Sequence, residues 1–171
     1  AKNGVFGLLG EKLGHSYSPE IHRFLLNEDY KLCPLKPEEV APFLAKRDFL
    51  GLNVTIPYKQ TVMPYLDEIS APARRIGAVN CIVNRSGRLY GYNTDYSGFM
   101  EMLKDQNIEV SGRRVAVLGS GGAAKSCRVA LEDMGASPVL VSRSEKPDAI
   151  TYDQLYAEEA SIRRRICKKS L

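Results

Sequence analysis

The sequence predicts an α/β fold in which a mixed-sheet domain precedes a second, incomplete domain of parallel β-α-β type. Three observations support this prediction. Short apolar runs such as 52–56 alternate along the chain with segments of helical periodicity. The dipeptide Ser86-Gly87 joins two strand-like runs and indicates an antiparallel hairpin in the first half. In the second half, a glycine-rich turn lies between an apolar run and a helical pattern, which is typical of a parallel crossover unit.

Local signals place the elements of the first half. Strands are expected at 5–9, 30–35, 52–56, 78–84 and 88–92. A serine cap with Pro19 at the first helical position begins one helix, and Pro37 begins a second that runs to about Lys46. Shorter helices are expected after Pro57 and at 71–76. A further helix is expected at 95–105. The inward faces of the three longer helices are expected to be Ile21, Phe24 and Leu25; Val40, Phe43 and Leu44; and Phe99, Met102 and Leu103.

The second half is expected to contain a strand at 115–118, a glycine turn at 119–124, a helix at 125–134 and a strand at 139–141. Another helix should begin near 151–155. The polar stretch at about 107–113 is the predicted boundary, which gives a first domain at 1–107 and a partial second domain at 108–171. The sheet of this second domain is expected to end on an unpaired edge after Val141.

Composition excludes several classes of function. The chain of 171 residues is 44% hydrophobic with a net charge of +4, which is ordinary for a globular protein and gives no basis for a nucleic-acid partner. No apolar run is long enough for a membrane span, and no signal peptide is evident. Four scattered cysteines without a C-x-x-C motif and two histidines argue against a metal site. We therefore expect reduced thiols and a cytoplasmic protein.

The glycine turn fits a nucleotide-binding fingerprint. Gly119 and Gly121 with a small residue at Ala124 match G-x-G-x-x-G/A, and the turn lies between a strand and a helix as the motif requires. Such a turn aims backbone amides at a pyrophosphate. The alternative is an ordinary tight turn. The prediction is a Rossmann-like dinucleotide-binding domain, and its expected pyrophosphate contacts are Gly119, Ser120, Gly121, Gly122 and Ala123.

The end of the next strand predicts the cofactor. Dinucleotide enzymes that use NAD usually have an acidic residue there, whereas this chain has Ser142, Arg143 and Ser144 with Lys146 nearby. An arginine with flanking hydroxyls suits a 2′-phosphate, so NADP is expected. Glu145 weakens the argument, and the alternative is a solvated basic loop.

Four further stretches, taken in order, resemble one family. They are His15-Ser16-Tyr17-Ser18-Pro19, Asn53-Val54-Thr55-Ile56-Pro57-Tyr58-Lys59, Gly77-Ala78-Val79-Asn80 and Gly91-Tyr92-Asn93-Thr94-Asp95. With the glycine turn and Ser142-Arg143-Ser144, the set from about Val5 to Leu155 is similar to shikimate dehydrogenase. The resemblance implies NADPH-dependent reduction of 3-dehydroshikimate to shikimate, a step towards the aromatic amino acids.

The resemblance also implies that the domain at 1–107 binds the substrate and the partial domain at 108–171 binds NADP, and it implies roles for individual residues. Ser16 and Ser18 would bind the substrate carboxylate. Asn53, Thr55, Asn80 and Asp95 would hold ring hydroxyls, and Lys59 would be the catalytic lysine, paired with Asp95.

The residue chemistry agrees with these roles. Two hydroxyls on one short turn can donate to a carboxylate, and a lysine amine can give or take the proton at the reacting oxygen. Each residue also has a structural alternative. The two serines can cap a helix, and the Asn and Thr side chains can lie on a solvent-facing strand edge. Lys59 can be a surface lysine, and Asp95 can cap the following helix.

The chain departs from the family pattern in its second half. The family is normally longer, and the basic tail from about residue 161 does not resemble it. The chain therefore looks truncated, and little turnover is expected from it. A module that binds a shikimate-like acid without turnover, a quinate/shikimate dehydrogenase and a methylenetetrahydrofolate dehydrogenase remain as alternatives. A small-molecule substrate and a monomer or homodimer are expected.

Overall fold

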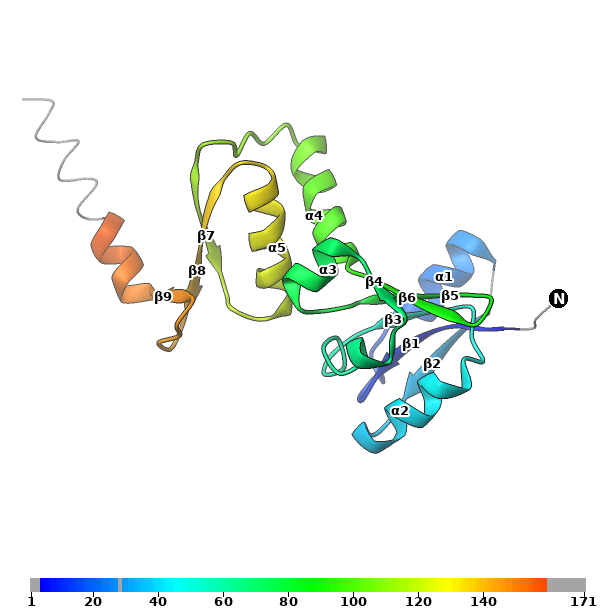
Figure 1. The fold of residues 1–171 in the computed structure, drawn as a ribbon. Coiled ribbons are helices and arrows are strands. Elements are labelled where there is room, and N and C mark those ends of the chain that lie inside the picture. Colours follow the sequence, from blue (N-terminus) through cyan, green and yellow to red (C-terminus); the bar gives the residue numbers. More distant parts are fainter. Residues whose placement is uncertain (1–3, 28, 160–171) are drawn as a thin grey trace, which may run out of the picture. The chain divides into compact units, whose positions relative to one another are not determined.

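The computed structural model describes residues 4–27 and 29–159 (Figure 1). The chain divides after Thr94 into two compact units, and each is described separately. The predicted basic tail from about 161 lies outside the described residues. The helix predicted at 95–105 clusters with the second unit, although the sequence prediction assigned it to the first domain. No helix in the described ranges is long and apolar enough to cross a membrane.

The first unit is built on a mixed six-stranded sheet in the order β2-β1-β3-β5-β6-β4. β1 pairs in parallel with β2 and β3, while β3, β5 and β6 are antiparallel neighbours. The short edge strand β4 runs parallel to β6. The mixed sheet confirms the predicted fold class. The strands are β1 (Phe6–Gly10), β2 (Tyr30–Pro34), β3 (Gly51–Val54), β4 (Glu68–Ile69), β5 (Cys81–Arg85) and β6 (Arg88–Tyr92).

One face of this sheet is apolar and forms the core of the unit. Side chains alternate between the two faces of a strand, so every second residue points into this core. Helix α2 (Pro37–Lys46) contributes Val40 and Leu44, as its periodicity predicted. The 3-10 helix η1 (Met63–Tyr65) and helix α3 (Ala71–Ile76) complete the unit. The sheet residues of the core include Leu9, Leu52, Val54, Ile82 and Leu89.

Helix α1 (Ser18–Leu26) differs from the prediction in the face that it buries. Ile21, Phe24 and Leu25 were expected to point inward, but they are 53%, 89% and 68% exposed. The helix instead packs towards β2 through its other side, where the His22 ring stacks on Tyr30. Periodicity identified an apolar stripe, but it could not say which element covers it.

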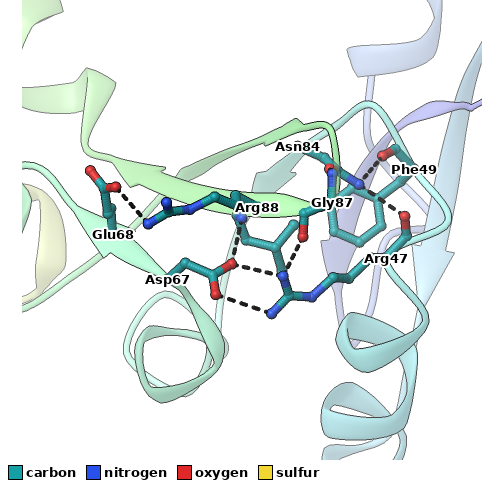
Figure 2. Close-up of polar contacts among 8 residues, drawn as sticks. Arg47, Phe49, Asp67, Glu68, Asn84, Gly87 and Arg88 are labelled. Atoms are coloured by element: carbon teal, nitrogen blue, oxygen red, sulfur yellow. Dashed lines mark hydrogen bonds and ion pairs between the residues drawn. The ribbon is translucent and has the colours of Figure 1, made fainter.

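A polar cluster ties α2 to the β5–β6 hairpin (Figure 2). Arg47 caps α2 in a left-handed conformation, and its guanidinium donates to the carbonyl of Gly87 and pairs with Asp67 at 2.9 Å. Asn84 donates to the carbonyls of Arg47 and Phe49 at 2.9 and 2.8 Å. The hairpin is therefore attached at its turn, which leaves the opposite end of the sheet to carry the predicted site.

The second unit contains a parallel three-stranded sheet in the order β7-β8-β9. Helix α5 packs on β7 and β8, and Leu103 of α4 joins Val110 and Leu131 in a small core. This arrangement is the predicted β-α-β crossover. The elements are α4 (Thr94–Asp105), β7 (Arg114–Leu118), α5 (Gly122–Asp133), β8 (Ser137–Ser142) and β9 (Ala149–Thr151), followed by helical residues 152–159.

Strand β9 corrects the prediction that the sheet ends on an unpaired edge after Val141. β8 is the middle strand, and its register with β9 pairs Val141 with Ile150. The three-residue run at 149–151 is too short to carry a periodic signal, so sequence patterning could not reveal it. The edge after β8 is thus covered.

Candidate active site

The Ser16–Ser18 turn leads into α1. The Ser16 amide donates to the carbonyl of Leu13 at 3.1 Å, and the Ser18 amide donates to Ser16 Oγ at 3.2 Å. The helix begins at Ser18 with Tyr17 at the cap position, and no side-chain cap bond is formed there. Since Ser16 Oγ accepts from the backbone, its own proton stays available to a ligand. Both serine side chains are partly exposed.

The polar face of β3 lies on the side of the sheet opposite the core. Asn53 aligns with Leu8 of β1 and Cys81 of β5. Its Oδ1 accepts a hydrogen bond of 2.8 Å from the hydroxyl of Tyr30, at the start of β2. Thr55 follows the strand, and its amide donates to the carbonyl of Leu9 at 2.9 Å. The strand therefore presents an amide whose orientation is set from β2, on the far side of β1.

Backbone bonds hold the lysine turn against the Gly77–Asn80 motif. The carbonyl of Lys59 accepts from the amide of Val79 at 2.8 Å, and the amide of Val54 donates to the carbonyl of Asn80 at 2.8 Å. The buried Tyr58 donates its hydroxyl to the carbonyl of Leu35 at 2.5 Å. The lysine turn and the Gly77–Asn80 motif, about twenty residues apart in sequence, therefore lie together where β3 ends and β5 begins. This region forms one edge of the first unit.

Asn80 connects this edge to the start of α4. Its side chain is 8% exposed, and Oδ1 accepts from the amide and the hydroxyl of Thr94 at 2.8 and 3.2 Å. The amide group is thereby oriented with its nitrogen available as a donor. Asp95 follows Thr94 but belongs to the second compact unit. The pairing of Lys59 with Asp95 therefore stays a prediction.

Burial shapes the acid–base behaviour of the groups beside Asn53. Desolvation, with smaller contributions from Cys33 and Cys81, raises the pKa of Tyr30 to about 12, and a side-chain hydrogen bond with Ser18 opposes this rise. Burial also raises the pKa of the Cys81 thiol. Tyr30 thus keeps its proton at neutral pH and acts as a hydrogen-bond donor.

The glycine turn of the second unit has the conformation that the motif requires. Gly119 has φ = +132°, which L side chains rarely adopt, and its amide donates to the carbonyl of Val141 at 2.9 Å. Helix α5 begins at Gly122, three residues before the predicted start at 125. The Lys125 amide bonds to the carbonyl of Gly121, so the amides of the three residues before it are free of intrahelical partners.

A cavity of about 300 Å³ opens between this turn and the end of β8. Arg143 and Ser144 are exposed in its wall, whereas Ser142 is 5% exposed and accepts from the Ser144 amide at 3.4 Å. Lys146 Nζ donates to Ser120 Oγ at 2.8 Å across the cavity. Gly122 and Ala123 do not line it. The lining residues are Gly119, Ser120, Gly121, Val141, Ser142, Arg143, Ser144, Lys146 and Tyr152.

Two residues of the candidate site, Tyr30 and Tyr152, were not identified from the sequence. Tyr30 was read only as the first residue of a strand, and no local pattern distinguishes it from other strand tyrosines. Tyr152 lines the cavity beside the glycine turn because β9 returns the chain to β8, and β9 was not predicted. In both cases the signal lies in strand pairing, which brings together residues that are distant in sequence.

The fold and these motifs define an α/β protein that joins a mixed-sheet unit to a Rossmann-like unit. Residues 8–82 match the family described as the shikimate dehydrogenase substrate binding domain. The chain is 46% identical over 151 residues to the NADP⁺ shikimate dehydrogenase of Clostridium perfringens (strain SM101 / Type A), covering 83% of this chain and 56% of the relative. The resemblance to shikimate dehydrogenase is thereby confirmed, and residues 8–82 carry the substrate binding domain of that family.

Solved structures agree with this result. Shikimate dehydrogenase 1 from Peptoclostridium difficile has a TM-score of 0.76 and 42% identity, with 89% of this chain and 62% of that chain covered. Shikimate 5-dehydrogenase from Thermus thermophilus, in complex with NADP(H) and shikimate, has a TM-score of 0.74 and 36% identity, with 82% and 56% covered. The chain spans about 56% of the length of the curated relative.

Proposed function

We propose that the chain serves as an NADP-dependent shikimate dehydrogenase, which reduces 3-dehydroshikimate to shikimate. One observation carries the proposal. The segments bearing Asn53, Lys59 and Asn80 are hydrogen-bonded to one another along one edge of a unit whose sequence matches a shikimate dehydrogenase substrate binding domain. A polyhydroxylated cyclic acid needs several oriented amide and hydroxyl groups, and this edge supplies them.

The substrate would be held at two ends. The hydroxyl proton of Ser16 is available to a carboxylate, and Ser18 supplies a second hydroxyl on the same turn. Asn53, Thr55 and Asn80 would bind ring oxygens, and the oxygens of both asparagine amides are already engaged by protein donors. Their nitrogens are therefore directed to a ligand. This argument supports the residue roles that the family resemblance implied.

Lys59 would transfer the proton that accompanies hydride transfer. Reduction of a ketone places a negative charge on the reacting oxygen, and an ammonium group can neutralise it by donating a proton. The backbone of Lys59 is held by the Val79 amide, and its side chain is partly exposed. Asp95 would fix the position of the amine.

The residues of the second unit fit NADP. The open amides at the start of α5 and the glycine conformation at Gly119 suit a pyrophosphate. Arg143 and Lys146 supply two cations for a 2′-phosphate at the end of β8. When bound, NADPH would supply the hydride.

The proposal is tested by measuring NADPH oxidation with 3-dehydroshikimate, together with calorimetric titrations of shikimate and NADP⁺. Turnover that depends on both compounds supports it. Binding of shikimate without turnover would identify the chain as a non-catalytic binding module. Faster turnover with quinate and NAD⁺ than with shikimate and NADP⁺ would indicate a quinate dehydrogenase instead.

Localisation and assembly belong to the same proposal. We propose a cytoplasmic protein that acts as a monomer or homodimer on small molecules. Cys33, Cys81 and Cys127 are partly buried free thiols in the described part of the chain, which is consistent with a reducing compartment.

A further inference from the structure

Tyr30 lies between two segments of the proposed substrate site that the sequence separates widely. Its hydroxyl donates to Asn53 Oδ1 at 2.8 Å, and it also shares a side-chain hydrogen bond with Ser18. The strand order β2-β1-β3 brings this about, because a tyrosine on β2 can reach across β1 to β3. One phenol thus touches both the carboxylate turn and the hydroxyl-binding strand.

The directions of these bonds follow from the proton count. A phenol has one proton, and Asn53 Oδ1 can only accept, so that proton points to Asn53. In the ligand-free chain the Ser18 hydroxyl must then be the donor to the Tyr30 oxygen, and a bound carboxylate would compete with that oxygen for the Ser18 proton. This donation occupies a lone pair of the phenol and leaves its proton directed at β3. The Asn53 side chain is consequently held with its carbonyl oxygen towards Tyr30 and its NH₂ group away from it.

The ring of Tyr30 is itself held in place. His22 of α1 stacks on it with ring centroids 3.9 Å apart and an interplanar angle of 13°. The first residue of β2 is also fixed by its register with Phe6 of β1. A rigid aromatic ring is a better anchor for an amide than water, because it loses little further freedom when the site fills.

We propose that Tyr30 is a positioning residue of the substrate site, which sets the Asn53 amide so that its NH₂ group faces the bound acid. The inference rests on the proposed function, because it assumes that Asn53 binds a ring oxygen. Without the phenol, an asparagine amide can rotate between two orientations, and binding must then select one of them. Binding to an amide that is already held in one orientation avoids this loss of side-chain freedom.

The test is a double-mutant cycle on shikimate affinity, measured by calorimetry with the full 171-residue chain. Tyr30→Phe keeps the ring that stacks on His22 and removes only the hydroxyl. We expect it to weaken shikimate binding by about threefold to tenfold, the range for a binding side chain that is no longer held in one orientation. In an Asn53→Ala background the same change should have an effect below about twofold, because the amide to be positioned is gone. Equal effects in the two backgrounds would overturn the inference.

Tyr90→Phe is the matched control. Tyr90 is a partly exposed tyrosine of β6 in the same unit, and Arg85 lies over its ring at 5.1 Å. This variant should leave shikimate affinity unchanged. Thermal unfolding of each chain shows whether the fold is retained. A loss of affinity in Tyr90→Phe equal to that in Tyr30→Phe would mean that the site responds to general loosening of the sheet, which contradicts a positioning role.

A second readout needs no ligand. The side-chain NH₂ signals of Asn53 in a ¹H–¹⁵N spectrum can be assigned by their loss in Asn53→Ala. Tyr30→Phe should shift them, while Tyr90→Phe should not. If the wild-type chain fails to bind shikimate, the proposed function fails. The positioning inference is then judged on these signals alone: a shift supports it, and unchanged signals overturn it.

Discussion

Arg47 and Asp67 form an ion pair of 2.9 Å that joins the end of α2 to the bend just before β4. The same arginine donates to the carbonyl of Gly87. Asp67 Oδ2, which pairs with Arg47, also accepts a hydrogen bond of 2.7 Å from the amide of Leu89. The carboxylate therefore accepts bonds from a backbone amide and from a guanidinium. These hydrogen bonds hold the pKa of Asp67 below its ordinary value, and the bond from the Leu89 amide has the largest effect.

This lowered pKa predicts a dependence of stability on pH. The folded-state pKa of Asp67 lies below the unfolded value of about 3.9, so its stabilising contribution is complete above that value. The contribution is lost as the pH falls through the folded pKa. Asp67→Asn should therefore lower the melting temperature at about pH 6, and the difference from wild type should shrink at about pH 3.

The matched control is Glu68→Gln. Glu68 neighbours Asp67 and pairs with Arg88 at 3.0 Å, but more than half of both side chains is exposed. Exposed pairs contribute little, so this variant should melt close to wild type across the range. A difference between wild type and Asp67→Asn that stays constant with pH would contradict the assignment.

Lys59→Ala tests the proton donor. Loss of a general acid–base group typically lowers turnover by a factor of about 100 to 10,000, and we expect a loss in this range. Shikimate affinity should change far less, because the proposed contacts of Asn53 and Asn80 with the ring would remain. Steady-state kinetics and a shikimate titration separate the two quantities. Lys104→Ala, which removes an exposed lysine paired with Glu101, serves as control. A near-normal turnover number in Lys59→Ala would remove Lys59 from the mechanism.

The two serines of the α1 turn should anchor the carboxylate. Replacing Ser16 and Ser18 with alanine should raise the Michaelis constant for 3-dehydroshikimate, since each hydrogen bond to a charged group is worth about 1.5–3 kcal/mol. The measurement is repeated with an analogue that lacks the carboxylate, for which the penalty should be much smaller. If both compounds suffer equally, the serines only support the start of the helix.

Arg143 and Lys146 should distinguish NADP from NAD. Only NADP has the 2′-phosphate that these cations would bind, so Arg143→Ala and Lys146→Ala should weaken NADP⁺ binding more than NAD⁺ binding. Calorimetric titration of both cofactors gives the ratio directly. Arg113→Ala, an exposed arginine in the same unit, is the control and should change neither affinity. Equal losses for the two cofactors would show that the 2′-phosphate is read elsewhere.

The long, periodic elements of the fold were predictable. The pattern of Val40, Phe43 and Leu44 placed α2 correctly, and the apolar run at 115–118 together with the following glycines predicted the crossover. The short strands β4 and β9 were missed, because two or three residues carry no period. The prediction that the apolar stripe of α1 faces inward was also wrong, because periodicity does not specify which element covers a stripe.

The sequence predicted the residues of the candidate site that stand in local motifs, but it did not predict contacts between residues that are distant in the chain. Ser16, Asn53 and Lys59 stand in recognisable motifs, and the structure gives each a definite local setting. The contribution of Tyr30 depends on the strand order β2-β1-β3, which no local pattern contains. The Ser120–Lys146 contact likewise depends on the turn that joins β8 to β9.

The stacking of His22 on Tyr30 has a consequence for motion. Short helices at the surface with one exposed apolar side tend to open before the rest of a domain unfolds, and α1 is such a helix. Each opening would withdraw His22 from the ring that orients Asn53. Amide hydrogen exchange in α1 should then report on substrate affinity: on warming, exchange at Arg23 and its neighbours would accelerate over the same temperature interval in which shikimate binding weakens, well before the β1–β3 amides exchange.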